Sequence, residues 1–514
     1  MELALTLDPS SNKSLQAQIF DQIRVLILDG RLQADMALPP TRLVAERYRV
    51  SRNTVIIAYD RLAAEGYVEP RGTSGVFVTS IPPDDFLLIS SPDKLIQHKR
   101  EGDDQSSGPL LCFAGSRGGA EDRPAIDFWV GRSAASGFPL RVWRRIVTKL
   151  LSGEPQYLTD YCDPAGLPQL RRAIADHLGR TRGMDVTTEQ IVVTAGGQDA
   201  LNLVLNLLRT HTAQFCIENP CYAGASMLFQ GENLPIEPIP VDGEGLRTDV
   251  LPNVKRSLLY VTPSHQYPTG VVMSLSRRLA LLRWAEETNS YIVEDDYDSD
   301  FRYDGPPLTA LSGLDRGRRV FYVGTFSKSV GAGLRLGFAV VPRVYAEDAR
   351  MLKARMSNGQ SWLEQCALAE FIRDGHFDRH VRKLRQIYKD RRDCLISALR
   401  KRVPEAAISG QDSGLHLVWR MPAGMPSART VQLRARTAGI GVYSLSSGSA
   451  FDFDGMAPDD RLMFGYASLT EPEITRAVES LFRILPRVGS FNVAQGEQLL
   501  GRNANGAETC AVLR

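Results

Sequence analysis

The chain has 514 residues, of which 43% are hydrophobic and 23% are charged, and its formal net charge at pH 7 is +2. This length exceeds that of an ordinary single domain, and the composition excludes both a disordered chain and one that is basic over its whole surface. No run of about twenty apolar residues and no secretory signal is evident, and the seven cysteines form no paired motif, so we expect a cytoplasmic protein with reduced thiols, no membrane span and no metal centre.

The first eighty residues predict three helices followed by two short strands. Apolar side chains at helical spacing predict a first helix over residues 15–28, which Gly30 closes. Thr41 is the expected N-cap of a second helix, and Ser51 is the expected N-cap of a third. The side chains expected to face inward on the third helix are Val55, Ala58, Tyr59 and Leu62. The runs 66–70 and 75–78 predict two strands around the turn 71–74.

Three helices followed by a β wing is the order of a winged helix-turn-helix, whose third helix enters the major groove with its first residues. Arginine suits guanine edges and phosphates, and asparagine suits adenine. Residues 1–80 carry no net charge as a whole, but basic residues are concentrated between positions 42 and 54, so the electrostatic footprint is local. The pattern alone also allows a small helical protein-interaction module.

Four strings carry a resemblance to the winged-helix domain of GntR-family bacterial repressors: 38–45 (LPPTRLVA), 50–55 (VSRNTV), 62–67 (LAAEGY) and 71–78 (RGTSGVFV). The resemblance implies a double-stranded DNA operator as partner and association with the bacterial nucleoid. It further implies that the DNA-binding residues are Arg42, Ser51, Arg52, Asn53, Thr54, Arg71 and Thr73.

The rest of the chain predicts a linker, a large α/β domain and a tail. Residues 81–122 are polar and lack periodicity, as a flexible linker does. Between residues 123 and 486, helical stretches alternate with short β-branched runs, which predicts an α/β domain with a mostly parallel sheet. Residues 487–514 are rich in Gly, Asn and Ala, and we expect a disordered tail without function.

Lys328 stands in the string 325–337 (TFSKSVGAGLRLG), between two hydroxyl residues and ahead of a glycine-rich loop that leads to Arg335. This arrangement suits a Schiff base to pyridoxal 5′-phosphate, in which the lysine holds the aldehyde while hydroxyls and a guanidinium hold the phosphate. A lone lysine is more often a solvated surface charge, so the interpretation depends on residues upstream.

Three upstream sites supply the other partners of such a cofactor. Asp295 follows the apolar run 291–293, where a carboxylate can pair with the pyridine nitrogen, and Tyr297 can reach the ring hydroxyl. Gly197 and Gln198 lie at a strand–glycine–helix junction, which favours a phosphate. Tyr222 follows another strand and could stack on the ring. Taken singly, these sites are also compatible with an acidic surface loop, an ordinary turn and a core tyrosine.

Together the strings resemble the fold-type I aminotransferases from about residue 157 to residue 469. The resemblance implies a large pyridoxal-phosphate domain with a smaller C-terminal α/β lobe, in which Lys328 forms the Schiff base. Asp295 would pair with the pyridine nitrogen, Tyr297 would contact the ring hydroxyl and Tyr222 would stack on the ring. The residues implied to hold the phosphate are Gly197, Gln198, Thr325, Ser327 and Arg335.

Two further positions match residues of that family. Tyr161 matches a tyrosine that reaches the phosphate from the neighbouring subunit, which implies a homodimer. Arg461 matches the arginine that clamps a substrate carboxylate, a bidentate task suited to guanidinium. A surface salt bridge is the plainer interpretation of Arg461.

Two positions depart from the aminotransferase pattern. Tyr267 stands where an asparagine usually precedes Pro-Thr-Gly, and a tyrosine cannot supply the same amide contact to the ring hydroxyl. The string 264–270 (SHQYPTG) instead resembles the MocR/GabR-type regulators, in which a GntR winged helix is fused to an aminotransferase-like domain. Some members of that group carry a second carboxylate-binding arginine at the position of Gly224, so we expect a different effector from theirs.

We therefore predict a pyridoxal-phosphate-dependent transcriptional regulator of the MocR/GabR type, with a winged helix over residues 1–80. Its effector, a small amino compound or the cofactor itself, would be sensed by aldimine chemistry at Lys328. The enzyme alternative is an active aminotransferase with a DNA-binding appendage, which Tyr267 disfavours. The binding alternative is a repressor whose large domain has lost the cofactor, which Lys328, Asp295, Tyr297 and Arg335 disfavour.

Overall fold

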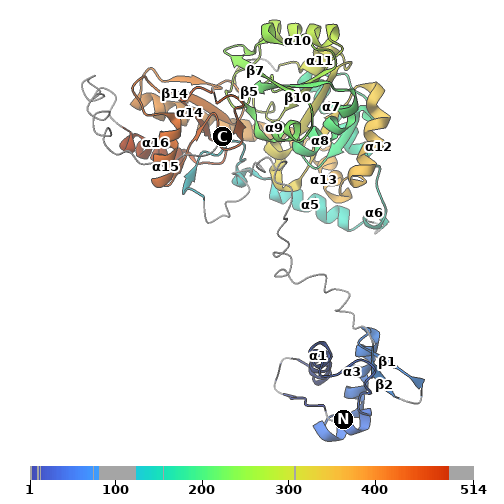
Figure 1. Ribbon diagram of the computed structural model, residues 1–514. Helices are drawn as coiled ribbons and strands as arrows, with labels where there is room; N and C mark the ends of the chain where they lie inside the picture. Colours follow the sequence, from blue (N-terminus) through green and yellow to red (C-terminus); the bar gives the residue numbers. More distant parts are fainter. Residues whose placement is uncertain are drawn as a thin grey trace, which may run out of the picture. The chain divides into compact units, whose positions relative to one another are not determined.

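The computed structural model describes residues 3–8, 11, 13–72, 75–79, 123–153, 156–305, 308–455 and 457–485. They fall into two units, one of residues 3–79 and one of residues 123–485 (Figure 1). Thr73, the predicted linker 81–122 and the predicted tail 487–514 lie outside the described residues. Within the described residues, no helix is both long and apolar enough to cross a bilayer, and the five cysteines there form no disulfide.

The small unit is a bundle of three helices with a two-stranded wing. Its elements are α1 (Leu15–Leu28), α2 (Thr41–Tyr48), α3 (Arg52–Ala64), β1 (Val68–Pro70) and β2 (Val76–Val78). The strands are antiparallel, with Val68 opposite Val78. The four predicted inward-facing residues of α3 are buried in the core of this unit, so that prediction is confirmed.

The two expected N-caps of the small unit have different outcomes. Ser51 caps α3, because its Oγ accepts a hydrogen bond from the backbone N–H of Thr54 at 3.1 Å. The prediction for α2 was wrong by one residue. Pro40, with φ −55° and ψ 139°, is the last extended residue, so Thr41 is the first residue of the helix and no side chain caps it.

The large unit is built on a mostly parallel sheet of eight strands, which confirms the predicted α/β class. In spatial order the strands are β4 (Ile191–Thr194), β12 (Gly337–Val340), β11 (Val320–Thr325), β10 (Tyr291–Asp296), β9 (Ser257–Val261), β5 (Gln214–Asn219), β7 (Ile236–Asp242) and β8 (Gly245–Leu246). Only β12 and β8 run against the others. The sheet therefore presents the carboxyl ends of its central parallel strands at one edge, where ligands of open α/β sheets bind.

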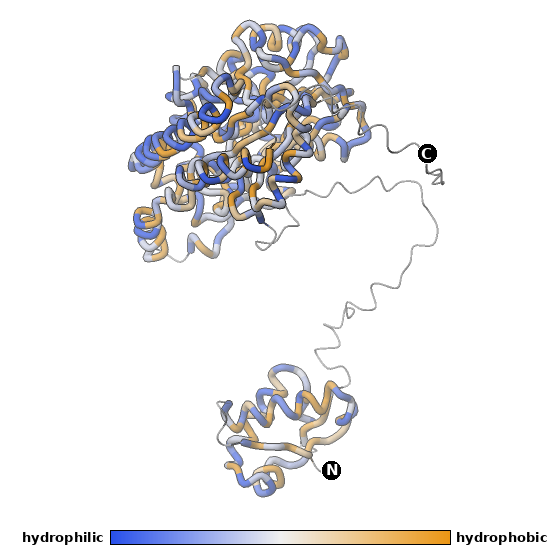
Figure 2. The backbone as a smooth tube through the Cα atoms, turned by 90° about the vertical axis from the view of Figure 1, so that its left-hand side faces the viewer, coloured by the Kyte–Doolittle hydropathy of each residue, from blue (hydrophilic) through white to orange (hydrophobic). Residues whose placement is uncertain are grey.

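Helices cover both faces of this sheet, and the alternation along β9 shows how. Leu258 and Tyr260 pack in the cluster with α8, α9 and α12, whereas Leu259 and Val261 pack in the cluster with α10 and α11. In Figure 2 the helices at the surface alternate between hydrophilic and hydrophobic residues, as helices with one buried face do. The helices of this part are α5 (Leu140–Leu151), α6 (Gln156–Thr159), α7 (Pro168–Arg182), α8 (Gly197–Leu208), α9 (Ala223–Gln230), α10 (Leu275–Glu287), α11 (Leu311–Asp315), α12 (Ala346–Ser357) and α13 (Trp362–Arg373).

A smaller C-terminal lobe follows the long helix α14 (His376–Arg402), and it lies beside the large sheet in Figure 1. Its antiparallel sheet has the order β13 (Ala407–Ser409), β14 (His416–Arg420), β18 (Arg461–Gly465) and β16 (Tyr443–Ser444). The sheet packs against α14, α15 (Ala428–Thr437) and α16 (Glu471–Ile484) around the buried Trp419. The predicted small α/β lobe is thus confirmed.

Short pairings and single turns complete the large unit. The lobe is tied back to the rest by β3 (Ile126–Asp127) with β15 (Ile440–Gly441) and by β6 (Cys221–Tyr222) with β17 (Ala450–Phe451). The turns are η4 (Ala135–Gly137), η5 (Thr188–Gln190), η6 (Arg209–His211), η7 (Thr248–Val250), η8 (Ser327–Gly331), η9 (Ala332–Leu334) and η10 (Arg343–Tyr345).

Candidate functional site

A cavity of about 270 Å³ opens at the carboxyl ends of β10 and β11 and the start of α8. It gathers residues from segments far apart in the sequence. Predicted cofactor residues that line it are Lys328, Asp295, Tyr297, Tyr222, Gly197, Gln198, Thr325, Ser327 and Arg335. Residues that line it and were not predicted as cofactor residues are Trp129, Val130, Gly131, Leu201, Tyr260, Tyr267, Ala332 and Ser449.

The Lys328 amine points into this cavity from η8, directly after β11. Its Nζ donates a hydrogen bond to the carbonyl oxygen of Gly131 at 2.8 Å. The hydroxyl of Ser133 donates to the carbonyl oxygens of Ser327 and Lys328, at 3.2 and 3.0 Å, and so fixes the backbone that carries the lysine. Burial lowers the pKa of Lys328, which favours a neutral, nucleophilic amine.

Gly131 is required by this contact. Its φ is +89°, and a Cβ at this position would lie 2.8 Å from the Lys328 Nζ. Gly131 could not be predicted from the sequence, because an isolated glycine in a loop carries no signal of its own.

Asp295 is held at the end of β10 by a tyrosine from the adjacent strand. The Tyr260 hydroxyl donates to Asp295 Oδ2 at 2.8 Å. Burial raises the pKa of Asp295 to about 7. A carboxyl in this state would ionise fully only opposite a cation, and a protonated pyridine nitrogen is such a partner.

The opposite end of the cavity has the features of an anion site. Helix α8 begins at Gly197, so the N–H groups of its first turn lack partners within the helix. Arg335 donates to the carbonyl oxygen of Ala195 in the preceding turn, and a Cβ at Gly196 would lie 3.3 Å from its Nη2. The Thr325 hydroxyl donates to Ser327 Oγ at 2.9 Å on the same side. A guanidinium, two hydroxyls and helical N–H groups therefore converge there.

The aromatic wall is packed around a glycine. A Cβ at Gly224 would lie 2.4 Å from both Gln198 Oε1 and the ring of Tyr222, so a side chain fits there only if both residues move. Gln198 Oε1 is buried and finds no hydrogen-bond partner among the described residues. Tyr267 lies between the other two tyrosines, edge-on and 6.1 Å from the ring of each, Tyr222 and Tyr297.

These residues fit pyridoxal phosphate. They offer a buried lysine amine with a lowered pKa, a buried carboxyl with a raised pKa, an aromatic ring for stacking and a set of donors for a phosphate. One residue at the phosphate end, Gln198, has a buried oxygen without a hydrogen-bond partner among the described residues. Potential metal ligands form a different group. Among the residues that the structure describes, His265, Asp298 and His416 bring ligand-type atoms within 4.8 Å of one another.

Two predicted residues lie outside this cavity. Tyr161 is 88% exposed, so it contributes nothing to the site of its own chain. Arg461 lines a neighbouring cavity of about 500 Å³ together with Thr269 and Ser409, and its Nε lies 3.7 Å from Asp460 Oδ1. Because side chains alternate along a strand, Arg461 shares its face of β18 with Met463, which packs in the cluster of Tyr267.

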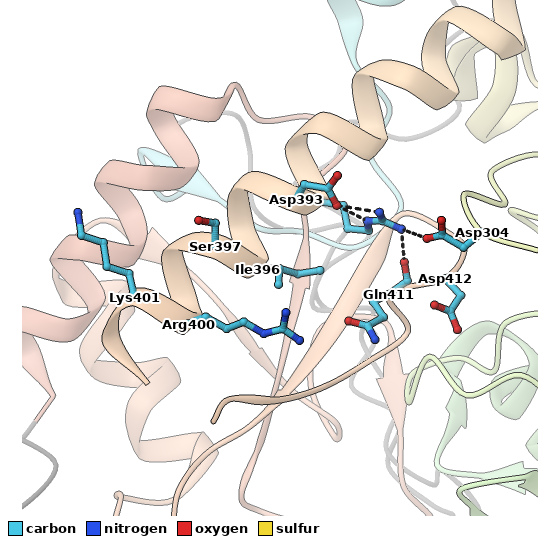
Figure 3. A pocket seen from close by; sticks show the side chains of 9 residues that line it. Asp304, Asp393, Ile396, Ser397, Arg400, Lys401, Gln411 and Asp412 are labelled. Atoms are coloured by element: carbon cyan, nitrogen blue, oxygen red, sulfur yellow. Dashed lines mark hydrogen bonds and ion pairs between the residues drawn. The ribbon is translucent and has the colours of Figure 1, made fainter. Parts of the chain in front are cut away.

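Another cavity, of about 690 Å³, lies between α14 and the loop before β14 and contains no predicted site residue (Figure 3). Arg392 is fully engaged at its wall, because its Nη1 lies 2.9 Å from Asp304 Oδ2 and 2.6 Å from the carbonyl oxygen of Gln411, and its Nη2 lies 2.7 Å from Asp393 Oδ1. These bonds engage the Arg392 guanidinium within the protein, and Arg400 and Lys401 also line the cavity.

The predicted DNA-contacting residues of α2 and α3 are accessible. Arg42, Arg52 and Asn53 are exposed and Thr54 is half-exposed. Arg52 Nε lies 3.5 Å from Thr41 Oγ1, so its guanidinium stands beside the start of α2. Ser51 is also exposed, but its hydroxyl is used in capping α3.

Arg71 differs from the other predicted DNA-contacting residues. It forms ion pairs with Asp35 and, at 2.7 Å, with Glu69, and its guanidinium lies 4.9 Å from the centre of the Phe77 ring. A basic side chain held in this way stabilises the wing, and it must give up contacts within the protein before it can bind a phosphate.

Comparison with known proteins matches both units to described families. Residues 15–78 match the model of bacterial regulatory proteins of the gntR family, and residues 131–481 match that of aminotransferase class I and II. The probable rhizopine catabolism regulatory protein MocR of Rhizobium meliloti is 34% identical, over 93% of this chain and 95% of its own length. This chain belongs to the GntR-type transcriptional regulators that carry an aminotransferase class I and II domain.

A further relative and a solved structure agree with this family assignment. The pyridoxine biosynthesis transcriptional regulator PdxR of Corynebacterium glutamicum is 32% identical, over 91% of this chain and 96% of its own length. Among solved structures, the α-aminoadipate aminotransferase LysN of Thermus thermophilus superposes with a TM-score of 0.63 at 26% identity, over 70% of this chain and 91% of its own. That structure is a complex with N-(5′-phosphopyridoxyl)-L-leucine.

Proposed function

We propose that this regulator binds pyridoxal 5′-phosphate through Lys328 and senses a small amino compound, or the cofactor itself, at the same site. The observation that carries this proposal is the single cavity that gathers nine residues predicted from separate strings of the sequence. When bound, pyridoxal phosphate supplies an aldehyde that condenses with amines and a ring that withdraws electrons.

The residues of the cavity divide this work among them. Lys328 provides the amine for covalent attachment, and Asp295 keeps a proton on the pyridine nitrogen. Tyr222 stacks on the ring, and its position is fixed because Ala450 of β17 pairs with it. Tyr297 contacts the ring oxygen. The phosphate is bound by Gly197, Gln198, Thr325, Ser327 and Arg335.

Two residues outside the cavity extend the proposal. Tyr161 binds the phosphate of the cofactor held by a second copy of the chain in a homodimer. Its side chain is exposed in its own chain and is therefore available to that copy. Arg461 binds a carboxylate of the effector, and the face of β18 on which it lies supports this role. A side chain would fit at Gly224 only if Gln198 and Tyr222 moved, and the glycine itself offers the effector no second carboxylate clamp.

The winged helix regulates transcription by binding DNA in the bacterial cytoplasm. Arg42, Arg52, Asn53 and Thr54 contact an operator on the nucleoid, with further contacts from Ser51 and from Arg71 and Thr73 of the wing. An effector can change transcription only by binding one arrangement of the dimer more tightly than another. Two half-sites on the operator would then be read differently in the two arrangements.

The visible absorption spectrum of the purified protein, recorded with a panel of amines and amino acids, tests this function. We expect a yellow protein whose band shifts with one compound and then stays constant. A protein that stays colourless with added pyridoxal phosphate contradicts the proposal.

The same experiment examines the enzyme alternative, which the aminotransferase fold and the placement of Lys328 favour. An active aminotransferase would lose the band on addition of an amino acid and regain it with a keto acid.

A further inference from the structure

A buried group of polar side chains lies directly behind Tyr297, and no role has been assigned to it above. His265 follows β9, Asp298 follows β10 and His416 belongs to β14 of the C-terminal lobe. All three are at most 3% exposed. We propose that Asp298 and His265 form a positioning pair that holds the Tyr297 hydroxyl at the wall of the cavity, and that His416 secures this pair from the C-terminal lobe.

The donated hydrogen bonds run from Tyr297 through His265 to Asp298. His265 Nδ1 lies 2.9 Å from Asp298 Oδ2, and a carboxylate only accepts, so Nδ1 carries the proton. The Tyr297 hydroxyl donates to the carbonyl oxygen of His265 at 3.0 Å and lies 3.2 Å from Nδ1. Both the backbone and the ring of His265 therefore contact the phenol, and Asp298 fixes the orientation of that ring.

Glycines enclose the imidazole closely. A Cβ at Gly414 would lie 2.1 Å from His265 Nδ1 and 2.6 Å from Asp298 Oδ2. Those at Gly410 and Gly270 would lie 3.2 and 3.4 Å from His265 Nε2. Gly410 and Gly414 belong to the C-terminal lobe, so the lobe itself forms one side of this enclosure.

His416 completes the contact between the two parts of the unit. Its ring centre lies 4.6 Å from that of His265, and its Nε2 lies 3.1 Å from the carbonyl oxygen of Pro268, to which it donates. The next ring is Tyr267, 5.7 Å away. A movement of the lobe relative to the sheet would therefore reach the Tyr297 hydroxyl through His265.

The hydrogen bonds use one ring nitrogen of each histidine. Nδ1 of His265 and Nε2 of His416 are both occupied as donors, to Asp298 and to Pro268. The nitrogens that remain, His265 Nε2 and His416 Nδ1, are buried and find no partner in the described part of the chain.

Several other charged or titratable groups face the phenol and the imidazole. From β10 and the loop after it come Asp295 and Asp298, from β5 comes Glu218, and from beyond β9 comes Tyr267. Lys328 lies across the cavity and interacts with both aspartates. All of these groups except Asp298 are common to all variants of the test below, and the His265 variants report the positioning pair with the Asp298 charge kept.

The test rests on the proposed function and uses the full-length protein loaded with pyridoxal phosphate. The readouts are the pH midpoint of its visible band and its affinity for the cofactor. When the cofactor is bound, Tyr297 turns its single proton from the His265 carbonyl oxygen to the ring oxygen. This hydrogen bond favours the ionised ring oxygen, so Tyr297→Phe should raise the midpoint by about one pH unit. Asp298→Asn should raise it similarly, and Asp298→Asn combined with Tyr297→Phe should add nothing to Tyr297→Phe alone.

A second pair of variants keeps the test decisive if the first variants fail to fold. His265→Asn keeps an N–H near the place of Nδ1, so its pH midpoint should stay close to that of the wild type. His265→Leu has no such donor, so its midpoint should rise. His177→Gln is the matched control, because His177 lies 3.4 Å from Asp300 in a half-buried histidine–aspartate pair of the same unit, and it should leave the midpoint unchanged.

Three results would overturn the inference. The first is an unchanged pH midpoint in Asp298→Asn. The second is a shift by Asp298→Asn that is as large in the Tyr297→Phe variant as in the wild type, and the third is the same midpoint in His265→Asn and His265→Leu. Variants that no longer bind the cofactor at all would also count against a role limited to positioning. A wild-type protein without a visible band would instead refute the proposed function itself.

Discussion

Lys353 and Asp199 form a largely buried ion pair at the end of the cavity where α8 begins. The Lys353 Nζ lies 2.6 Å from Asp199 Oδ2, and the lysine side chain is 0% exposed. The same carboxylate oxygen accepts the N–H of Ala195 at 2.8 Å, in the turn whose carbonyl receives Arg335. Helix α12 thereby holds the turn at which α8 begins.

Lys353→Met should lower the free energy of unfolding of the large unit by about 2–4 kcal/mol, because Asp199 keeps a largely buried charge without its partner. It should also weaken cofactor binding, since the turn of the phosphate cradle loses its support. Urea denaturation and cofactor titration measure the two effects. Lys149→Met is the matched control, because that lysine is 66% exposed in its pair with Glu370, and it should change stability by less than about 1 kcal/mol. Equal losses in both variants would contradict a supporting role for the buried pair.

Lys328→Ala should abolish covalent attachment of pyridoxal phosphate and leave DNA affinity largely unchanged, because the amine lies in the large unit and the DNA-contacting residues lie in the small one. Mass spectrometry after borohydride reduction detects the attachment, and a DNA-binding titration measures the affinity. Lys149→Ala should retain the covalent adduct. Loss of the winged-helix fold in Lys328→Ala would contradict this separation of functions.

Arg52→Ala should weaken operator binding by about 1–3 kcal/mol if Arg52 reads a guanine edge. Arg61 of the same helix is the control, because it pairs with Glu65 at 2.8 Å and its guanidinium lies 4.0 Å from the centre of the Phe20 ring, within the protein. Arg61→Ala should therefore leave DNA affinity nearly unchanged. Titrations against operator and random DNA separate the cases, since an equal loss on both would make Arg52 a phosphate contact.

Glu218 provides a pH-dependent test of the buried polar site. Burial raises the pKa of Glu218 from its ordinary value of 4.5 to about 7. The folded state therefore keeps a proton that the unfolded state has already released, and this group lowers stability as pH rises from about 4.5 to about 7. Glu218→Gln should remove this pH dependence. The free energy of unfolding of the variant, relative to that of the wild type, should therefore be about 1–3 kcal/mol higher at about pH 8 than at about pH 5.

The measurement is thermal or urea unfolding of the cofactor-free protein at both pH values. Glu244→Gln is the control, since Glu244 is 63% exposed. A difference from wild type that is the same at the two pH values would show that Glu218 does not titrate as its burial predicts.

Local sequence patterns determined much of this protein. The spacing of apolar residues predicted the helix over residues 15–28, and Ser51 identified the start of the third helix, because both signals depend only on neighbouring residues. The strings around Lys328, Asp295 and Tyr222 predicted residues that line one cavity, because each string is a strand end or a helix start with its own chemistry.

Only the tertiary structure decided which distant groups meet. Gly131 is 197 residues from the lysine amine that it binds, and Tyr260 contacts Asp295 from the neighbouring strand, so neither left a local signal. The same holds for His265, Asp298 and His416, which come from three separate segments and are brought together by the packing of the lobe on the sheet. Sequence periodicity records what a residue's own element requires, whereas contacts across elements depend on how those elements pack.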